Sequence, residues 1–570
     1  MKYLTLALLL LIAFSCPAYS EPSPWGSLDN KPYDPETDVD IDMFMNSKEN
    51  AAPQKSYGDL IEREILSRTD GDPMHPPKKG AVLKYANRFS YAELPSGGKI
   101  PPTTLKGEQV VFFCLTGAGT LHGAGEDFDI YPEVSFIVPD GLTFSMNSGA
   151  DGPLTFYLVS EPTYEGFTPR TSITWHDEAK SEYDIAGAHW CNANKFLIGR
   201  DDGQTTFQYV LDVRQFPFTM AQPHSHNEGF EEIWCTISGP GRTLLGKQLR
   251  DMPPGTAFKV PPNGKTPHAH INPTGETVRY FEFAIHGPDY DREGANPPFS
   301  RLDGAFFNPE RDIDADMFMG SWQENYPART HGNLIERNIL SAGNGDPVKP
   351  ERSGAVLNSV NRFVYASLEP RDSTLPTTLA GEQEIFYVLS GNGTLRGAGE
   401  EFDLHDGVGF LAPEGLQFTI TNTDTAEPLT FYLVSEPTYD GFKPNDRLVV
   451  RDLADSGYKT TTGHWANHTK SVIGKDDGTA TVINALVVTL MPDTIAQPHS
   501  HRPNVEEVWC TISGDIHALL GKHFRELPPG TAYMIPPDDK TWHSNLNLSE
   551  KPVTLFYWGL HPGQGLRPGH

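Results

Sequence analysis

The chain has 570 residues, with 74 acidic against 45 basic side chains and a formal net charge of −29 at pH 7. This length exceeds the roughly 100 to 200 residues of one domain, so several domains are expected. The negative charge would repel phosphate backbones and anionic membrane surfaces, which argues against nucleic acid as a partner.

The first twenty residues have the pattern of a cleaved secretory signal. Lys2 precedes the apolar run YLTLALLLLIAF, and Ala18 and Ser20 are the small residues of a cleavage site. A lipoprotein signal that uses Cys16 is the alternative, disfavoured by Phe14 at a position where such signals carry a small or aliphatic residue. No later stretch reaches the ~18 uninterrupted apolar residues of a membrane span. The sequence predicts a secreted or periplasmic protein without a membrane span.

The rest of the chain is an internal duplication. GDLIEREIL at Gly58 returns as GNLIERNIL at Gly332, and PLTFYLVSEPTYEGF at Pro153 returns as PLTFYLVSEPTYDGF at Pro428. The shift is 274 residues in the first pair and 275 in the second, because one residue is inserted between them. Two halves, about 30–300 and 305–570, are therefore copies of one another.

Each half has the pattern of an all-β protein. Short runs of Val, Ile, Phe, Tyr and Thr alternate with turns of Gly, Pro, Asn and Asp. In chain order the predicted segments are an N-terminal arm at 30–79, a β-unit at 80–168, a β-unit at 190–290, an inter-half arm at 305–353, a β-unit at 354–443 and a β-unit at 465–566.

Each arm is predicted to contain one short helix. In DLIEREIL, Asp59 can cap the first turn, Glu62 follows three residues later, and Ile61 and Ile65 lie one turn apart. The second arm repeats this spacing with Asn333 and Glu336.

Two near-identical segments carry the candidate metal ligands: AQPHSHNEGFEEIWCTISG at 221–239 and AQPHSHRPNVEEVWCTISG at 496–514. Alternate residues of a strand point to one face, so the two histidines of each segment project together. The following strand can offer only one of two adjacent carboxylates; Glu232 and Glu507 are preferred, with Glu231 and Glu506 as alternatives. A third histidine comes from TPHAHIN or TWHSNLN. The predicted ligands are His224, His226, Glu232, His268, His499, His501, Glu507 and His543.

These segments resemble the two sequence motifs of the cupin superfamily, a small double-stranded β-barrel. In that pattern HxH is followed by Glu, with Gly seven residues after the Glu, and a second motif has Gly and Pro six apart before His and Asn. Here the second motif begins with Gly255 and Pro261, and again with Gly530 and Pro536. The resemblance implies a tandem duplicated bicupin with four cupin-like barrels and a 3-His/1-Glu site in the second barrel of each half. Such a donor set suits Fe, Mn, Ni, Cu or Zn, which predicts two divalent transition metals per chain.

The first unit of each half resembles the same fold without metal ligands. Glu384 lies seven residues before Gly391, but Thr377 and Thr378 stand where the histidine pair belongs, and Phe418 replaces the later histidine. In unit one Val110 replaces the Glu and Phe144 replaces the His. We expect these two units to be structural partners of the metal-binding units, with ligand binding as the alternative.

Two further pairs of polar residues recur near the motifs. Gln222 and Gln497 lie two residues before the first histidine, so each can contact a metal-bound substrate or orient an imidazole. His189 and His464, each followed by Trp, are interpreted as packed linker histidines, with a pocket role as the alternative.

The resemblance implies a metal-dependent enzyme that acts on a small, oxygen-rich molecule. A dioxygenase-type oxidoreductase is the favoured reaction class. The alternatives are a lyase, decarboxylase or isomerase, which needs a nearby acid or base, and a non-catalytic metal- or carbohydrate-binding protein. Four barrels in one chain already contain the pairing that single cupins obtain by dimerising, so we expect a monomer, with a homodimer as the alternative.

Overall fold

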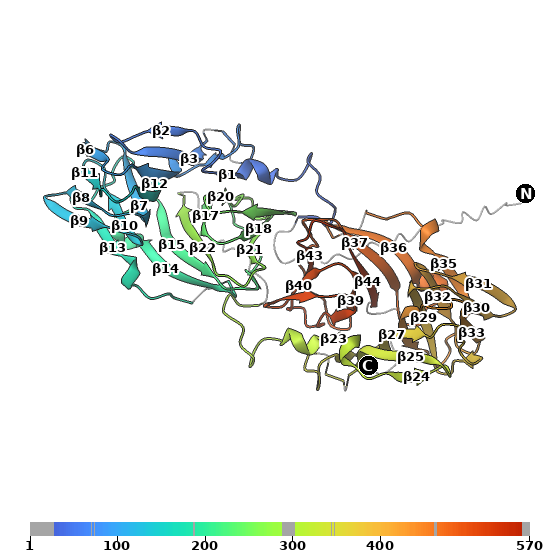
Figure 1. Cartoon of the computed structure of the whole chain (residues 1–570). Helices are drawn as coiled ribbons and strands as arrows, with labels where there is room; N and C mark the ends of the chain where they lie inside the picture. Colours follow the sequence, from blue (N-terminus) through green and yellow to red (C-terminus); the bar gives the residue numbers. More distant parts are fainter. Residues whose placement is uncertain are drawn as a thin grey trace, which may run out of the picture.

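Figure 1 shows the computed structural model, which describes residues 28–560 apart from 70, 73, 186–188, 288–301, 344, 347 and 461–463. The predicted signal at 1–20 and Cys16 lie outside the described residues. The four units, called barrels one to four in chain order, form a row in which barrels two and four are central and barrels one and three lie at the ends.

Barrel one consists of an eight-stranded and a four-stranded sheet. The larger sheet has the order β13 (Thr174–Asp177), β10 (Val134–Val138), β7 (Glu108–Thr116), β12 (Leu154–Pro162), β5 (Arg88–Leu94), β3 (Ile61–Arg68) and β2 (Pro53–Lys55), with β4 (Ala81–Leu83) paired to β3. The smaller sheet is β6 (Lys99–Thr104), β11 (Thr143–Ser148), β8 (Gly119–Gly123) and β9 (Glu126–Ile130).

Barrel two consists of a six-stranded and a four-stranded sheet. The larger sheet is β1 (Met45–Ser47), β20 (Thr256–Lys259), β17 (Phe230–Ser238), β22 (Val278–His286), β15 (Phe207–Gln215) and β14 (Asn192–Gly199). The smaller is β16 (Thr219–Met220), β21 (His268–Asn272), β18 (Gly241–Leu245) and β19 (Gln248–Met252).

The second half repeats this topology. In barrel three the larger sheet is β24 (Ala328–Thr330), β25 (Leu334–Ala342), β27 (Arg362–Leu368), β34 (Leu429–Pro437), β29 (Glu382–Ser390), β32 (Val408–Ala412) and β35 (Val449–Asp452), with β26 (Ala355–Leu357) paired to β25. The smaller sheet is β28 (Thr377–Thr378), β33 (Gln417–Asn422), β30 (Gly393–Gly397) and β31 (Glu400–Leu404). In barrel four the larger sheet is β23 (Met319–Ser321), β42 (Thr531–Met534), β39 (Glu506–Ser513), β44 (Val553–Leu560), β37 (Asn484–Leu490) and β36 (Asn467–Gly474). The smaller sheet is β38 (Thr494–Ile495), β43 (His543–Asn547), β40 (Ile516–Leu520) and β41 (His523–Leu527). The predicted all-β fold of four barrels in two copies is confirmed.

The helix predicted in each arm is wrong, because the segment forms a strand in both halves. Asp59–Leu66 leads into and forms part of strand β3, and the equivalent segment forms β25. Each strand has a β-bulge, between Glu64 and Leu66 and between Asn338 and Leu340, so buried residues recur at i, i+3 and i+4 and imitate one face of a helix. Antiparallel pairing with β5 and β27 then decides the conformation.

The helices that form within the described residues are short 3₁₀ segments between strands. They are η1 (Ile41–Phe44), η2 (Glu178–Lys180), η3 (Arg200–Asp202), η4 (Ala315–Phe318), η5 (Trp322–Glu324), η6 (Leu453–Asp455) and η7 (Lys475–Asp477). None of the helices within the described part of the chain has the length and apolar character needed to cross a membrane.

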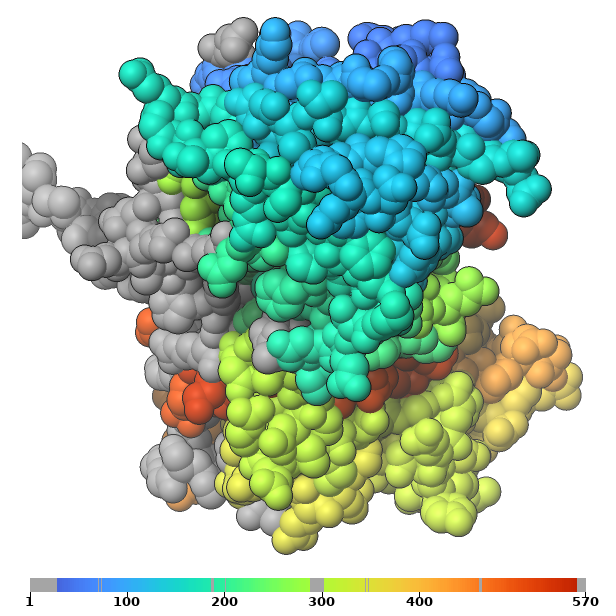
Figure 2. All heavy atoms as spheres, turned by 90° about the vertical axis from the view of Figure 1, so that its left-hand side faces the viewer, coloured from blue at the N-terminus to red at the C-terminus, as the bar shows by residue number. Residues whose placement is uncertain are grey.

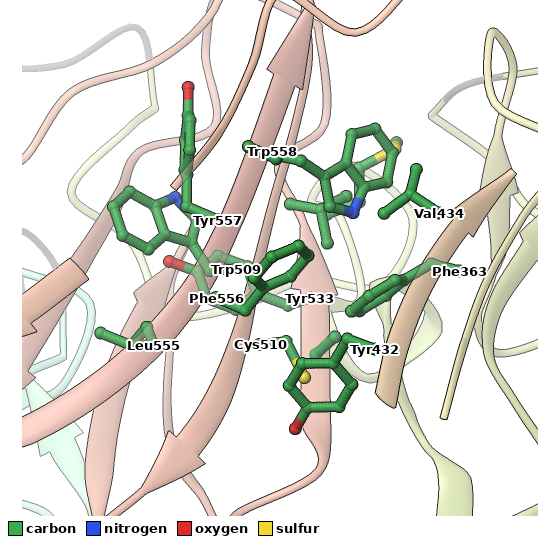
Figure 3. Packing of buried hydrophobic residues seen from close by; sticks show 14 of the residues in the cluster. Phe363, Tyr432, Val434, Trp509, Cys510, Tyr533, Leu555, Phe556, Tyr557 and Trp558 are labelled. Carbon is green, nitrogen blue, oxygen red and sulfur yellow. The ribbon is translucent and has the colours of Figure 1, made fainter. Parts of the chain in front are cut away.

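A shared hydrophobic core joins the two barrels of each half. Phe89 of barrel one stacks on Phe281 of barrel two, with ring centroids 5.8 Å apart. Figure 3 shows the equivalent packing in the second half, where Phe363 and Val434 of barrel three face Phe556 and Trp558 of barrel four. The sheets of paired barrels therefore pack face to face.

The two halves meet through their metal-site barrels. Trp190, Met220 and Leu244 form one apolar cluster with Trp465 and Leu519 from the other half. The opening strands of the halves lie on opposite sides, β1–β3 at the top and β23–β25 at the bottom of Figure 1. Figure 2, viewed along the row, likewise shows blue and cyan residues above the yellow-green ones. The halves thus face each other across a pseudo-two-fold arrangement.

Candidate metal centres

Site one, defined as His224, His226, Glu232 and His268, lies inside barrel two. An isolated bridge between His224 and His268 brings the HxH segment to the first residue of β21, with backbone hydrogen bonds of 3.1 and 2.8 Å. Glu232 Oε2 contacts His226 Nε2 and lies 3.2 Å from His268 Nε2. All four side chains are buried, and their potential ligand atoms lie within 4.8 Å of one another.

Site two, defined as His499, His501, Glu507 and His543, has the same construction in barrel four. His543 Nε2 lies 3.1 Å from His501 Nε2 and 3.2 Å from His499 Nε2. Glu507 Oε2 lies 3.2 Å from His501 Nε2. His499 and His501 are only partly buried, so site two is the more open of the two sites.

The orientation of the imidazoles fits a metal ligand set. His224 Nδ1 donates to the carbonyl of Gln222 at 2.9 Å, and His499 Nδ1 donates to the carbonyl of Gln497 at 2.8 Å. A carbonyl only accepts, so these rings direct Nε2 toward the cluster. A metal with bonds of about 2.0 to 2.1 Å to imidazole nitrogen separates two such nitrogens by roughly 2.9 to 3.4 Å at octahedral to tetrahedral angles. The separations of 3.1 and 3.2 Å in site two match this range.

At His224 and His543 the electrostatics favour the neutral imidazole, and at Glu232 they favour the ionised carboxylate. Burial, together with His268, holds the pKa of His224 well below its usual range, and burial lowers the pKa of His543 to about 3. Burial alone would raise the pKa of Glu232, but His226 and His268 hold it well below the usual value. A transition metal requires these protonation states of its ligands.

The adjacent glutamates point away from the histidines. Glu231 forms an ion pair with the buried Lys259 Nζ at 2.7 Å and accepts from the backbone N–H groups of Lys84 and Tyr85. Glu506 accepts from the backbone N–H groups of Asn358 and Ser359 at 2.9 and 2.7 Å. The structure therefore brings Glu232 and Glu507, the preferred residues, into the two clusters.

The surroundings of the carboxylate differ between the sites. In site two Trp509 Nε1 and Tyr557 OH donate to Glu507 at 2.7 and 3.3 Å. In site one the residue at the place of Tyr557 is Glu282, which hydrogen-bonds Glu232; burial, reinforced by Glu232, raises the pKa of Glu282 well above its usual value. Sequence reasoning missed Glu282, although comparing the two copies shows Glu opposite Tyr at this position.

The predicted glutamines lie beside the sites. Gln222 is buried and donates through Nε2 to the carbonyl of Leu302 at 3.2 Å, while Gln497 donates to the carbonyl of Leu28 at 3.3 Å. Their own carbonyls orient His224 and His499, as described above. Their observed contacts therefore fit the orienting alternative, and contact with a substrate stays a prediction.

His189 and His464 also lie at the sites, which favours the pocket alternative over a packed linker. The His189 ring stacks on His224 with centroids 4.6 Å apart, and His464 stacks on His499 at 4.8 Å. In each ring Nδ1 is buried and makes no hydrogen bond within the described chain. The repeat of a His-Trp pair in both copies was the available sequence signal.

Barrel three holds a different cluster, formed by His331, Glu336 and Glu384. The Arg362 guanidinium donates to Glu384 at 2.6 Å and to Glu336 at 3.1 Å, and His331 Nε2 lies 2.9 Å from Glu384. A cation therefore already occupies the space between the carboxylates, and we interpret the cluster as an ion-pair network. The interior of barrel three is a hydrophobic core that includes several phenylalanines, among them Phe418 at the predicted position of the missing histidine.

One family model matches the chain. Residues 364–435, which lie in barrel three, match the Cupin domain. The resemblance to the cupin superfamily is therefore confirmed, and the match lies in a barrel whose histidine positions are filled by other residues. No curated protein matches the sequence.

Solved structures that are similar to this chain include three of low sequence identity. The oxalate decarboxylase of Lactobacillus farciminis, in a formate complex, is 13% identical, with coverage of 44% of this chain and 87% of that chain and a TM-score of 0.33. AerE from Microcystis aeruginosa is 16% identical, with coverage of 43% and 99% and a TM-score of 0.33. Bacillus subtilis oxalate decarboxylase, in a study of its Mn(II) centres, is 15% identical, with coverage of 43% and 76% and a TM-score of 0.32. At these TM-scores the matches say nothing about the activity of this chain.

Proposed function

We propose that this protein is a metal-dependent cupin enzyme that acts on a small, oxygen-rich substrate at sites one and two. The observation that carries the proposal is the convergence of three imidazoles and one carboxylate, within 4.8 Å, at equivalent places in both halves. Two diverged copies keep the same four ligand types while neighbouring residues differ, as in NEGF against RPNV.

The chain's own residues prepare each site for a divalent transition metal. The four ligands would hold the ion, which would supply a Lewis acid with open coordination positions for substrate oxygens. The Gln222 and Gln497 carbonyls fix the orientation of one imidazole each. The buried position of site one limits access of bulk water and strengthens electrostatic interactions with a bound substrate.

The leading reaction class is a dioxygenase-type oxidoreductase. A mixed set of imidazole and carboxylate ligands suits Fe, Mn, Ni and Cu, which support oxygen chemistry. The proposed substrates are molecules that can bind through two neighbouring oxygens, such as enediols, catechols and flavonols.

A lyase or decarboxylase is the second candidate, favoured by Glu282. This reaction class needs an acid or base close to the bound substrate. Glu282 is 4% exposed and hydrogen-bonds Glu232, so site one contains a second carboxyl group beside the candidate ligands. In site two the corresponding position is Tyr557, a weaker acid.

We also propose that the protein is exported, because its first twenty residues have the pattern of a secretory signal. The mature chain would begin at Glu21. N-terminal sequencing of protein from the culture medium or periplasm tests this; an intact Met1 on the accumulated protein would contradict export by cleavage.

The experiment that tests the activity begins with elemental analysis of untagged protein. About two Fe, Mn, Ni or Cu ions per chain support the oxidoreductase, and oxygen consumption with catechols, enediols and flavonols is then measured. Zinc alone, or carbon dioxide release from carboxylate substrates without oxygen consumption, would favour the lyase. Protein that neither contains nor takes up metal would contradict both the oxidoreductase and the lyase. A non-catalytic binding protein would then be the favoured function.

A further inference from the structure

Two short backbone segments, here called straps, lie beside the metal sites. The first-half strap is Leu28–Asn30, at the start of the described chain, and the second-half strap is Leu302–Gly304. They are equivalent in the duplication, since each has the sequence Leu-Asp followed by Asn or Gly. Each strap contacts residues of both halves.

The second-half strap is bound to barrel two of the first half. The indole Nε1 of Trp190 donates to the carbonyl of Asp303 at 2.8 Å, and the Trp190 backbone N–H donates to the carbonyl of Gly304 at 3.0 Å. Gln222 donates to the carbonyl of Leu302 at 3.2 Å. All three strap carbonyls therefore accept from residues adjacent to site one.

The first-half strap is bound to barrel four in the same way. Trp465 donates through Nε1 to the carbonyl of Asp29 at 2.7 Å and through its backbone N–H to the carbonyl of Asn30 at 3.2 Å. Gln497 donates to the carbonyl of Leu28 at 3.3 Å. The exchange between the halves is thus reciprocal.

A buried lysine of the strap's own half holds the strap aspartate. Lys522 Nζ, between β40 and β41 of barrel four, lies 2.6 Å from Asp303 and 2.9 Å from Asp312. Lys247, between β18 and β19 of barrel two, lies 2.7 Å from Asp29 and 2.8 Å from Asp38. These charged hydrogen bonds are buried on the lysine side, with 0% and 2% side-chain exposure, so they are stronger than surface ion pairs.

The straps matter for the sites because of the residues they hold. Trp190 follows His189, and both have left-handed backbone conformations, with φ of 77° and 46°. Trp465 and His464 repeat this, with φ of 72° and 42°. Consecutive non-glycine residues rarely adopt this conformation, and surrounding contacts must maintain it. The strap supplies two hydrogen bonds to each tryptophan, and the preceding histidine stacks on a candidate ligand.

We propose that the two halves complete each other's metal sites: the strap of one half, fixed by a lysine of its own metal barrel, positions the His-Trp pair and the glutamine of the other half. Asp303 and Lys522 are positioning residues for site one, and Asp29 and Lys247 are positioning residues for site two. This inference rests on the proposed metal sites. It predicts that a change in barrel four alters the metal bound in barrel two, and the reverse.

The test uses full-length chains that keep one site each. His501→Ala leaves site one and His226→Ala leaves site two; both are loaded with Zn²⁺, and its release to a chromogenic chelator is timed. We expect Lys522→Met to accelerate release from site one about tenfold and to change release from site two less than about twofold. Lys247→Met should show the reverse pattern. Asp303→Asn and Asp29→Asn provide milder variants with the same crossed expectation, in case loss of a buried lysine prevents folding.

Arg525→Ala is the matched control for Lys522, because Arg525 lies on the adjacent strand and pairs with the exposed Asp316 at 2.9 Å. It should leave zinc release unchanged at both sites. Three results would show that the inference is wrong: each variant changes zinc release only at the site of its own half, changes it equally at both sites, or changes it at neither. None of these results would contradict the metal sites themselves. Chains that bind no zinc at either site would contradict the proposed function and this inference together.

Discussion

Barrels two and four share their ligands but differ in the residues that surround them. Near Glu232 the neighbour is the acid Glu282, whereas Glu507 accepts hydrogen bonds from Trp509 and Tyr557. The site in barrel two is fully buried, and two histidines of the site in barrel four are partly exposed. Duplication has thus kept the donor set while changing the acid-base environment, so equal metal binding need not mean equal chemistry.

A second difference concerns the glutamate that precedes the carboxylate ligand in each site. Glu231 is neutralised by Lys259, but the residue at the equivalent position of barrel four is Met534. Glu506 accepts from the backbone N–H groups of Asn358 and Ser359 and from the Ser359 side chain, and burial raises its pKa to about 7. The equivalent buried carboxylate thus pairs with a lysine in one half and accepts from uncharged donors in the other.

The largest expected effect is the loss of a ligand. His226→Ala and His501→Ala should each lower the metal content by about one ion per chain, because a coordination bond is lost in each site. Elemental analysis of the two variants and the parent measures this. Unchanged metal content in either variant would contradict the assignment of that site as a metal site. The two sites could then no longer be compared as metal centres.

Exchanging the residues beside the carboxylates tests whether the sites differ in chemistry. If Glu282 is the acid or base of a lyase, Glu282→Tyr in a chain that keeps only site one, through His501→Ala, should reduce turnover by about 100-fold or more with the metal of site one retained. Tyr557→Phe is the control in barrel four and should leave the turnover at site one unchanged. Turnover that survives Glu282→Tyr would exclude this role for Glu282.

The burial of Glu506 predicts a pH dependence of stability. Glu506 has a folded pKa of about 7 against an ordinary value of 4.5, so the folded state binds more protons than the unfolded state between these values. Its favourable contribution is present below pH ~4.5 and is lost as the pH rises through ~7, on the order of 3 kcal/mol.

Met534→Lys should restore the pairing seen in barrel two. We expect it to raise the free energy of unfolding at pH 8 and to change it little at pH 5, as measured by denaturant titration at both pH values. Met534→Leu is the matched control. An equal gain at both pH values would show that the lysine acts through packing rather than by neutralising Glu506.

The smallest expected effects come from ion pairs that both halves retain at the surface. Arg250 pairs with Asp42 and Arg525 pairs with Asp316, each at 2.8 to 2.9 Å. Replacing either arginine with alanine should cost less than about 1 kcal/mol, and equally in both halves, because solvent screens these pairs. A clearly larger loss for one of them would reveal a further asymmetry between the halves.

The fold and the ligands could be predicted because they depend on local patterns and on repetition. The duplication fixed the number of units, and strand alternation placed the HxH histidines on one face. The strand β3 was predicted as a helix because its bulge gives helical spacing, and only pairing with the distant β5 reveals the strand. Glu282 and the Lys522–Asp303 contact join residues far apart in sequence, so spacing alone could not locate them.

The core shared between paired barrels limits how the protein can be divided. Phe281 and Phe556, in the metal-site barrels, are covered by Phe89 and Phe363 of the neighbouring barrels. A metal-site barrel expressed alone would expose this apolar face to water and tend to aggregate. A two-barrel half keeps this core covered, but it would expose the cluster of Trp190 and Trp465 and lose the strap of the other half.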